Sequence, residues 1–110
     1  MRIRRLSSDE ELYMLMLVSY DVSTVNPAGR RRLRRIAKAC EDWGVRVQNS
    51  VFECNLDWGQ WVALKAKLET ICDPDSDSLR YYNLGNNYQE KVIHFGAKSV
   101  PDLGHDALVI

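Results

Sequence analysis

A single carboxylate, Asp21, follows an apolar run that extends from Tyr13 to Tyr20. The run is too short to cross a bilayer, and its large aliphatic side chains predict a strand buried on both faces. A charged residue directly after such a strand lies at the rim of a sheet, where binding and catalytic groups are common. By position alone, the commoner role of this Asp is to cap the following turn through Ser23 or Thr24, and metal binding is the alternative.

A dense cluster of positive charge lies a short way further along the chain. It consists of Arg30, Arg31, Arg32, Arg34, Arg35 and Lys38. A solvated helix face is the ordinary explanation of such a run, but no glutamate neutralises it before Glu41, so the charges repel one another along the helix. Clusters of this density are typical of proteins that contact nucleic-acid phosphates, and such contacts read charge and shape rather than base sequence. We therefore expect these side chains to bind nucleic acid.

The composition indicates one globular domain. The 110 residues suit an α+β fold with a single core, and the formal net charge at pH 7 is zero. Residues 1–50 hold ten Lys and Arg against six Asp and Glu, whereas residues 51–110 hold five against nine.

The three cysteines form no C-x-x-C pair and the two histidines lack zinc-ligand spacing, so we expect reduced thiols in a cytoplasmic protein. Residues 1–12 lack the apolar core of a signal peptide, and no apolar stretch reaches membrane length.

The pattern of apolar residues, caps and turns predicts the elements that would position these groups. A helix begins at Pro27 after the cap Asn26 and extends to Trp43. A second helix opens with a capping box between Asp57 and Gln60. Strands are expected at residues 13–20, 45–54, 78–84 and 91–95, with a short terminal strand at 107–110. The chain would then comprise an N-terminal extension over 1–12, a ferredoxin-like domain over 13–96 and a C-terminal segment over 97–110 that carries a short edge strand.

The order β-α-β-α-β-β becomes the ferredoxin-like β-α-β-β-α-β sandwich if the long segment from Val45 to Leu56 breaks into two strands. The valines of that segment are expected to face the core. Its alternate positions would form a semi-polar face that contacts another protein surface: Arg46, Gln48, Ser50, Phe52 and Cys54. Because both helices of such a fold cover the same side of the sheet, its other side needs a partner. We expect a second copy, stacked face to face as a two-fold homodimer.

Four segments of the chain form a specific combination. They are Tyr20-Asp21-Val22, the arginine-rich helix, residues 44–54 with their Gln-x-Ser-Val-Phe-Glu-Cys core, and residues 77–82 with the sequence Asp-Ser-Leu-Arg-Tyr-Tyr. Together they resemble the second universal CRISPR-associated protein family, the small partner of the CRISPR spacer integrase. The resemblance implies a ferredoxin-like homodimer of the prokaryotic cytoplasm, a metal-dependent nuclease activity, and a structural role between integrase dimers during spacer acquisition.

The resemblance also implies a set of site residues. Asp21 would bind Mg²⁺ or Mn²⁺, and the two copies of Asp21 in a dimer could share one ion, since no motif places a second carboxylate beside it. Arg46, Ser50 and Phe52 match family positions associated with activity or with the dimer surface, and they join Tyr20 and Asp21 as the candidate catalytic set. Structural packing is the alternative for these three residues, and for Phe52 it is the favoured one.

The resemblance implies two functions, and the alternative to both is a binding protein that is neither an enzyme nor an adaptor. The first is a Mg²⁺-dependent endonuclease that acts on single-stranded RNA or double-stranded DNA. The second, expected to be the main cellular role, is an adaptor that carries duplex DNA on its basic helices and docks the integrase through its C-terminal strand. The alternative is a metal-independent, ferredoxin-like protein that binds single-stranded nucleic acid by stacking bases on Tyr81 or Tyr82. None of these functions involves a membrane.

Overall fold

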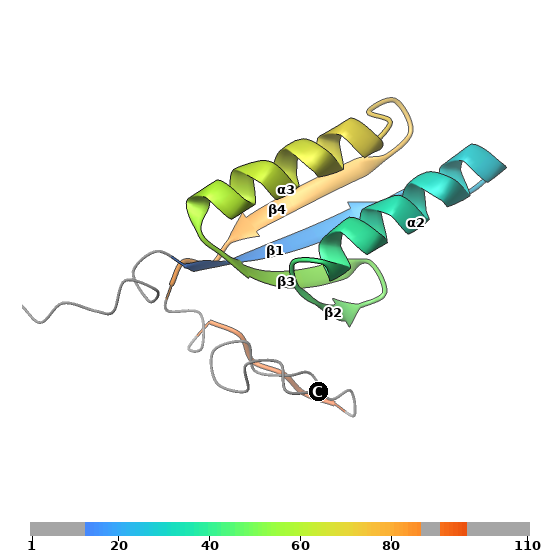
Figure 1. Cartoon of the computed structure of the whole chain (residues 1–110). Coiled ribbons are helices and arrows are strands. Elements are labelled where there is room, and N and C mark those ends of the chain that lie inside the picture. The colour runs from blue at the N-terminus through green and yellow to red at the C-terminus, as the bar shows by residue number, and fades with distance from the viewer. Residues whose placement is uncertain (1–12, 87–90, 97–110) are drawn as a thin grey trace, which may run out of the picture.

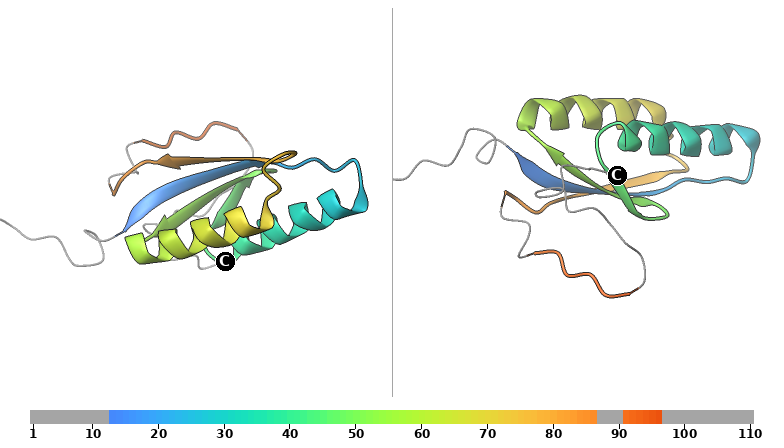
Figure 2. Two further views of the ribbon diagram at one scale, coloured as in Figure 1. Left: turned by 90° about the horizontal axis from the view of Figure 1, so that it is seen from above. Right: turned by 60° about the horizontal axis from the view of Figure 1, so that its bottom comes forward.

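Four strands and two helices make up the part of the chain that the computed structural model describes, residues 13–86 and 91–96. In chain order the elements are β1 (Met14–Asp21), α2 (Pro27–Glu41), β2 (Val45–Gln48), β3 (Val51–Leu56), α3 (Trp58–Ile71) and β4 (Ser78–Asn83). The strands form one antiparallel sheet in the order β2-β3-β1-β4 (Figure 1). Both helices lie on the same side of this sheet (Figure 2). The predicted ferredoxin-like β-α-β-β-α-β fold is confirmed.

The fold depends on the predicted break in the segment from Val45 to Leu56. The chain turns at Asn49 and Ser50, so that β2 folds back against β3 as an antiparallel hairpin. An irregularity in the pairing between Arg46 and Gln48 accompanies this turn. The hairpin supplies the extra strand that the ferredoxin-like order requires.

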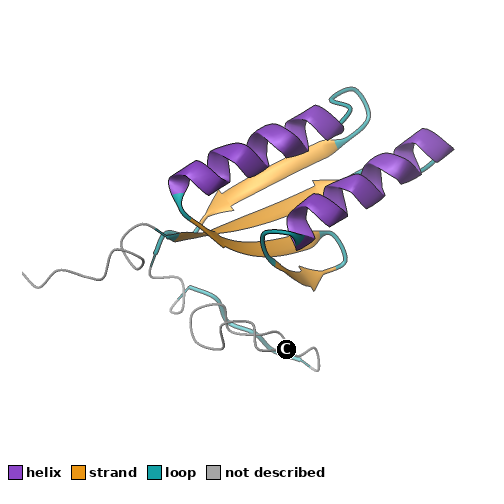
Figure 3. Cartoon of the chain, in the orientation of Figure 1, coloured by secondary structure: helices purple, strands orange, loops and turns teal. Residues whose placement is uncertain are grey.

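The strand predicted at residues 91–95 is wrong. Residues 91–96 form neither helix nor strand, and Figure 3 shows them as a loop. A strand needs a hydrogen-bonded neighbour, and the sheet of the described chain is completed by the hairpin instead. The side chains of Ile93 and Phe95 are accordingly 92% and 100% exposed. The predicted N-terminal extension, the C-terminal segment and its strand at 107–110 lie outside the described residues.

Alternation along β1 divides the sheet into two faces. Met16, Val18 and Tyr20 point toward the helices and are buried in the core, where they meet Ile36 of α2 and Leu68 of α3 among others. The remaining positions of the sheet form what we call the open face, which neither helix covers. From the strand pairing, it comprises Leu15, Leu17, Ser19 and Asp21 of β1, Val45 of β2, Val51, Glu53 and Asn55 of β3, and Ser78, Arg80 and Tyr82 of β4.

The two faces of the hairpin are the reverse of the prediction. Phe52 and Cys54 are fully buried beneath the helices, whereas Val45 and Val51 are only half-buried on the open face. The reason is side-chain volume: the larger side chains of Phe52 and Leu56 fill the space beneath the two helices better than valine side chains would. Full burial of a side chain such as Phe52 stabilises the fold by about 1.5–3 kcal/mol. Phe52 therefore faces the core and not a partner protein.

The helix starts follow the predicted caps. The side chain of Asn26 accepts a hydrogen bond from the backbone N–H of Gly29 at 2.9 Å, and Pro27 begins α2. At α3, the Asp57 carboxylate accepts from the N–H of Gln60 at 2.8 Å, while the Gln60 side chain accepts from the N–H of Asp57 at 3.0 Å. This reciprocal pair is the predicted capping box. Among the described residues, no helix has the length and apolar character needed to cross a membrane.

A buried carboxylate joins three parts of the fold. Asp77, just before β4, accepts hydrogen bonds from Arg32 Nε at 2.7 Å and Arg32 Nη2 at 3.2 Å. It also accepts from the backbone N–H of Ser23 at 3.1 Å and of Asp73 at 2.9 Å. The hydrogen bonds from Arg32 outweigh the effect of burial and hold the pKa of Asp77 below its usual value. The loop after β1, the helix α2 and the turn after α3 are thereby tied to one point.

We predict that Asp77→Asn lowers the melting temperature by about 5 °C or more at neutral pH, since each kcal/mol of lost stability costs roughly 4–8 °C in a domain of this size. Because the folded pKa of Asp77 is depressed, its contribution is present above about pH 4 and is lost as the pH falls through the folded pKa. The melting curves of wild type and variant should converge in acid. The control is Asp75→Asn, at an exposed position in the same turn. Equal melting temperatures for the two variants at neutral pH would contradict the prediction.

Candidate functional site

Asp21 lies at the exposed end of β1, the inner strand next to β4. In the antiparallel pairing it is opposite Ser78, and the preceding open-face residue Ser19 is opposite Arg80. Directly paired residues share a face of the sheet, so Asp21 faces away from both helices together with these side chains. The carboxylate is therefore accessible at the rim of the open face, as the sequence predicts.

The other members of the candidate catalytic set gather at the same end of the sheet. The rings of Tyr20 and Phe52 stack with centroids 6.2 Å apart, and the Arg46 guanidinium lies 5.0 Å from the centroid of Phe52. The carbonyl of Asn49 accepts from Arg46 Nη1 at 3.0 Å and from the Tyr20 hydroxyl at 3.4 Å. The Tyr20 N–H donates to the Ser50 carbonyl at 3.0 Å. These contacts fix the turn of the hairpin beside the end of β1.

This cluster and Asp21 are on opposite sides of the sheet. Arg46 pairs with Phe52 in the β2–β3 ladder, so both side chains are on the helix side, where Tyr20 is also buried. Burial raises the pKa of the Tyr20 phenol above its ordinary value. The geometry gives Tyr20 and Phe52 packing positions, while their predicted catalytic role, like that of Arg46 and Ser50, stays a prediction.

One protomer offers few ligands for a metal ion at Asp21. Among residues 13–86 and 91–96, no group of three or more His, Cys, Asp and Glu side chains is close enough to hold a metal. Such a donor set does not suit zinc, which needs three or four protein ligands. It does fit Mg²⁺ or Mn²⁺, because a hard cation of this kind retains several waters and needs only one or two carboxylates plus substrate phosphate. The exposed carboxylate of Asp21 meets that requirement, with the hydroxyl groups of Ser19 and Ser78 on the same face.

Arg80 is a candidate site residue that the sequence reasoning missed. Its Nε donates to the Tyr82 hydroxyl at 2.8 Å, and its guanidinium lies 5.7 Å from the centroid of the Tyr82 ring. In the described chain it forms no salt bridge, so its charge is available to an anion. The sequence could have indicated this residue, because side chains two positions apart in a strand, such as Arg80 and Tyr82, lie on the same face. Only the pairing of β4 with β1 shows that this face is the open one.

The two adjacent tyrosines point in opposite directions. Tyr81 packs edge-on against Trp61, with ring centroids 4.8 Å apart, and its hydroxyl donates to Glu69 at 2.9 Å. Burial and this hydrogen bond both raise the pKa of Tyr81. Only Tyr82 remains on the open face, 42% exposed and next to Arg80. Of the two rings on which the alternative function would stack bases, only that of Tyr82 lies on the open face.

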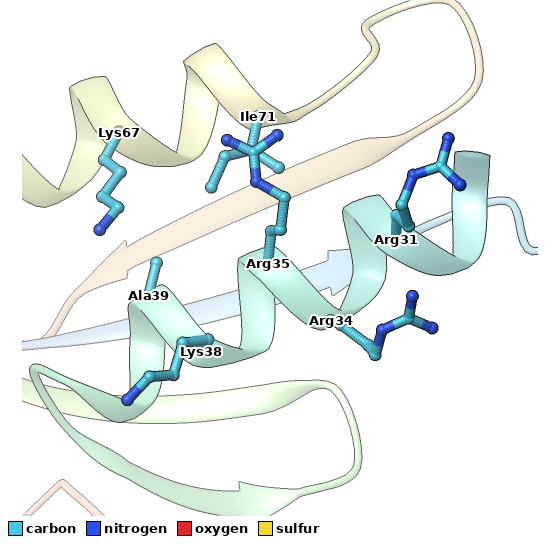
Figure 4. Close-up of a pocket in the computed structure, with 7 residues that line it drawn as sticks. All are labelled: Arg31, Arg34, Arg35, Lys38, Ala39, Lys67 and Ile71. Carbon is cyan, nitrogen blue, oxygen red and sulfur yellow. The ribbon is translucent and has the colours of Figure 1, made fainter. Parts of the chain in front are cut away.

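The six basic residues predicted to bind nucleic acid fall into two groups. Arg32 is committed to Asp77, and Arg30 donates to the carbonyl of Thr24 at 3.2 Å, so both brace the start of α2. The remaining four, Arg31, Arg34, Arg35 and Lys38, line a groove between α2 and α3 (Figure 4). Lys67 of α3 also lines this groove, although the sequence analysis did not select it. The reason is that only tertiary packing brings the two helices together.

The open face combines apolar side chains with polar groups that are partly removed from water. Leu15 is fully buried there, and Leu17 and Val51 are half-buried. Burial raises the pKa of the Glu53 carboxyl, and the side-chain oxygen of Asn55 is buried without a hydrogen-bond partner in the described chain. A buried polar atom of this kind normally has a partner. The composition of this face is therefore unusual for a surface that stays in water.

Known proteins are similar to this chain over most of its length. The family model "CRISPR associated protein Cas2" matches residues 14–92. A protein of Rhodospirillum rubrum named "CRISPR-associated endoribonuclease Cas2 3" is 62% identical over 96 residues, which cover 87% of this chain and 100% of that protein. A protein of Halalkalibacterium halodurans named "CRISPR-associated endonuclease Cas2" is 54% identical over 90 residues, which cover 82% of this chain and 94% of that protein.

A solved structure agrees with these sequence matches. The crystal structure of Streptococcus pyogenes Cas2 at pH 6.5 superimposes with a TM-score of 0.67 at 52% sequence identity, covering 76% of this chain and 100% of that one. On its sequence and its fold, this chain belongs to the CRISPR-associated Cas2 family.

Proposed function

We propose that this protein is a Mg²⁺- or Mn²⁺-dependent endonuclease that works as a homodimer and also serves as an adaptor in CRISPR spacer acquisition. The names of its relatives, which include both endoribonuclease and endonuclease, support a phosphodiesterase activity on RNA or DNA. The observation that carries the proposal is the position of Asp21, an accessible carboxylate at the rim of the open face.

The open face supports the homodimer. Both described helices cover the opposite side of the sheet (Figure 2). On the open face, Leu17 and Val51 are half-buried and the side-chain oxygen of Asn55 has no hydrogen-bond partner in the described chain. A second copy packed against this face would remove the apolar groups from water and could supply a hydrogen bond to Asn55. The face is isologous in such an arrangement, because each copy presents the same strands.

Within the dimer, Asp21 is the residue that would hold the metal. It is on the face that the second copy covers, but at the end of its strand, so that two copies of Asp21 could contribute to one ion. A bound Mg²⁺ would supply Lewis acidity at the scissile phosphate and lower the pKa of a coordinated water. The chain's own contribution is a carboxylate whose backbone is paired with Ser78 of β4.

Arg80 would contact the substrate next to Asp21. Its guanidinium is a fork of N–H donors that suits a phosphate, and the Tyr82 hydroxyl holds Nε at 2.8 Å in a defined orientation. Charge developing on the phosphate in the transition state would be stabilised by an arginine already in place. The helix arginines cannot have this role in the same protomer, because they are on the other side of the sheet.

The adaptor role is supported by the distribution of charge over the fold. In a dimer joined through the open faces, the basic helices would face outward on both sides, where they could contact the phosphates of a DNA duplex. The CRISPR integrase is the partner that we expect for such a dimer. Its predicted docking strand at residues 107–110 lies outside the described part of the chain.

We predict that Leu17→Glu converts the dimer to a monomer, because two carboxylates would be desolvated at the centre of the interface. Light scattering after gel filtration measures the mass, and circular dichroism checks that the fold is retained. Val62→Glu is the matched control, since Val62 is 49% exposed on α3 and away from the open face. A monomeric wild-type protein, or a dimeric Leu17→Glu variant, would refute the proposed interface.

We predict that Asp21→Asn lowers metal-dependent cleavage by at least about 100-fold, since it removes the carboxylate that would bind the metal in each protomer. The assay uses single-stranded RNA and duplex DNA with Mg²⁺, with Mn²⁺ and with a chelator. The melting temperature should change little, because the side chain is exposed. Cleavage at the wild-type rate would assign the activity elsewhere, and an unfolded variant would show that Asp21 is a structural cap.

We predict that Arg80→Gln raises the KM for the same substrate about tenfold, the cost of one charge-assisted hydrogen bond. Tyr82→Phe removes the acceptor that orients Arg80 and should produce a smaller effect in the same direction. Steady-state kinetics with the wild-type protein as reference measure both. If KM and kcat are unchanged in Arg80→Gln, this arginine does not touch the substrate.

A further inference from the structure

The β1–α2 loop, residues 22–26, leads from Asp21 directly into the first turn of α2. Figure 2 shows it at the end of the sheet, where the chain turns back from β1 toward the helix side. The ladder between β1 and β3 already ends at Ser19, and Asp21 itself is paired only with Ser78 of β4. On its other flank, the candidate metal ligand is therefore held by whatever holds this loop.

The closest contact of the loop is with the first turn of α2. Gly29 is buried there, and its N–H donates to the side chain of Asn26 at 2.9 Å. A Cβ atom at position 29 would overlap the carbonyl oxygen of Ser23 and would lie 3.0 Å from the carbonyl carbon. Because this carbonyl is part of the backbone, it cannot rotate out of the way as the end of a long side chain can. Only glycine lets the loop lie directly against the helix.

Two hydrogen bonds hold the same part of the loop. The N–H of Ser23 donates to the buried carboxylate of Asp77 at 3.1 Å, and Arg32 of α2 binds that carboxylate as well. The carbonyl of Thr24 accepts from Arg30 Nη1 at 3.2 Å. Two consecutive residues of the loop are thus fixed by side chains from two different parts of the fold.

These contacts do not come from burial of the side chains of the loop. Thr24 and Val25 are exposed, Val25 by 87%. All three contacts instead act on the backbone two and three positions after Asp21, which limits the directions that its carboxylate can take. A ligand that is already ordered does not have to be ordered when the metal binds, so less of the binding free energy is lost.

We propose that the β1–α2 loop positions Asp21 for the metal, and that Gly29 and Arg30 are positioning residues of the site. This role rests on the proposed function, in which Asp21 is the metal ligand, and it adds what keeps that carboxylate in place. Gly29 acts through the lack of a side chain, and Arg30 acts through Thr24 and not through a phosphate.

The first test moves the loop without changing any charge. Gly29→Ala places a methyl group against the Ser23 carbonyl. The matched control Gly59→Ala places the same group in the first turn of α3, where its nearest neighbour is the Asp57 carboxylate at 3.6 Å. EPR of free Mn²⁺ measures metal binding in the absence of nucleic acid, and the amide signal of Ser23 in an NMR spectrum reports whether the loop has moved.

We expect Gly29→Ala to shift the amide signal of Ser23 and to weaken Mn²⁺ binding about tenfold, the usual cost of disturbing a group that orients a metal ligand. Gly59→Ala should bind Mn²⁺ like the wild-type protein. A shifted signal with unchanged Mn²⁺ affinity would overturn the positioning role, because the loop would have moved without affecting the metal.

The second test changes an exposed residue, so that the fold is not at risk. Arg30→Ala removes the hydrogen bond to the Thr24 carbonyl. Loss of a positive charge would by itself strengthen the binding of a cation. We expect the opposite, a weakening of Mn²⁺ binding by about twofold, because the released loop outweighs the change in charge. Tighter or unchanged binding would argue against Arg30 as a positioning residue.

Asp21→Asn, measured alongside, separates the positioning role from the proposed function. If Asp21→Asn loses Mn²⁺ binding while Gly29→Ala and Arg30→Ala bind like wild type, Asp21 is a ligand that the loop does not position. If Asp21→Asn binds Mn²⁺ like wild type, the proposed metal site is wrong and the positioning role falls with it. Should circular dichroism show that Gly29→Ala does not fold, Arg30→Ala alone decides.

Discussion

The alternation of side chains along β1 governs the arrangement of everything that could be functional. Tyr20 is buried beneath the helices, where it stacks on Phe52, and the next residue must therefore point to the other side of the sheet. That residue is Asp21. A shift of the register by one position would exchange the two side chains, burying a carboxylate and exposing a tyrosine. The packing of one aromatic ring thus fixes the direction of the candidate metal ligand.

A second constraint acts on the backbone around the same point. The buried carboxylate of Asp77 binds Arg32 and the N–H of Ser23, two residues after Asp21. An arginine selected from the sequence for its charge is consequently a structural residue. On the other flank of β1, the hairpin turn is held by hydrogen bonds from Tyr20 and Arg46 to the carbonyl of Asn49. The rim of the open face is therefore rigid on both sides, which favours a preorganised site.

The zero net charge of the chain conceals two surfaces of different character. The helix side carries a groove whose charges are largely unpaired, whereas the open face carries apolar residues, a half-buried Glu53 and one accessible arginine, Arg80. A dimer joined through the open faces would place the grooves outward and the Asp21 residues near the interface. In that arrangement, a nucleic acid would bind on the helix side, whereas cleavage would take place at the rim of the open face.

The sequence by itself determined the two helices, the caps at Asn26 and Asp57 and the ferredoxin-like order, because each depends on residues close together in the chain. The strand that it predicted at residues 91–95 is absent, because the hairpin completes the sheet of the described chain instead. It also identified an exposed carboxylate at a strand end. It could not decide which face of the hairpin is buried, since Phe52 and the valines are both apolar and only the position of the helices distinguishes them. Likewise, tertiary packing alone pairs Arg32 with a distant Asp and brings Lys67 of α3 to the arginines of α2. Such contacts join residues far apart in the chain, and no local pattern of sequence encodes them.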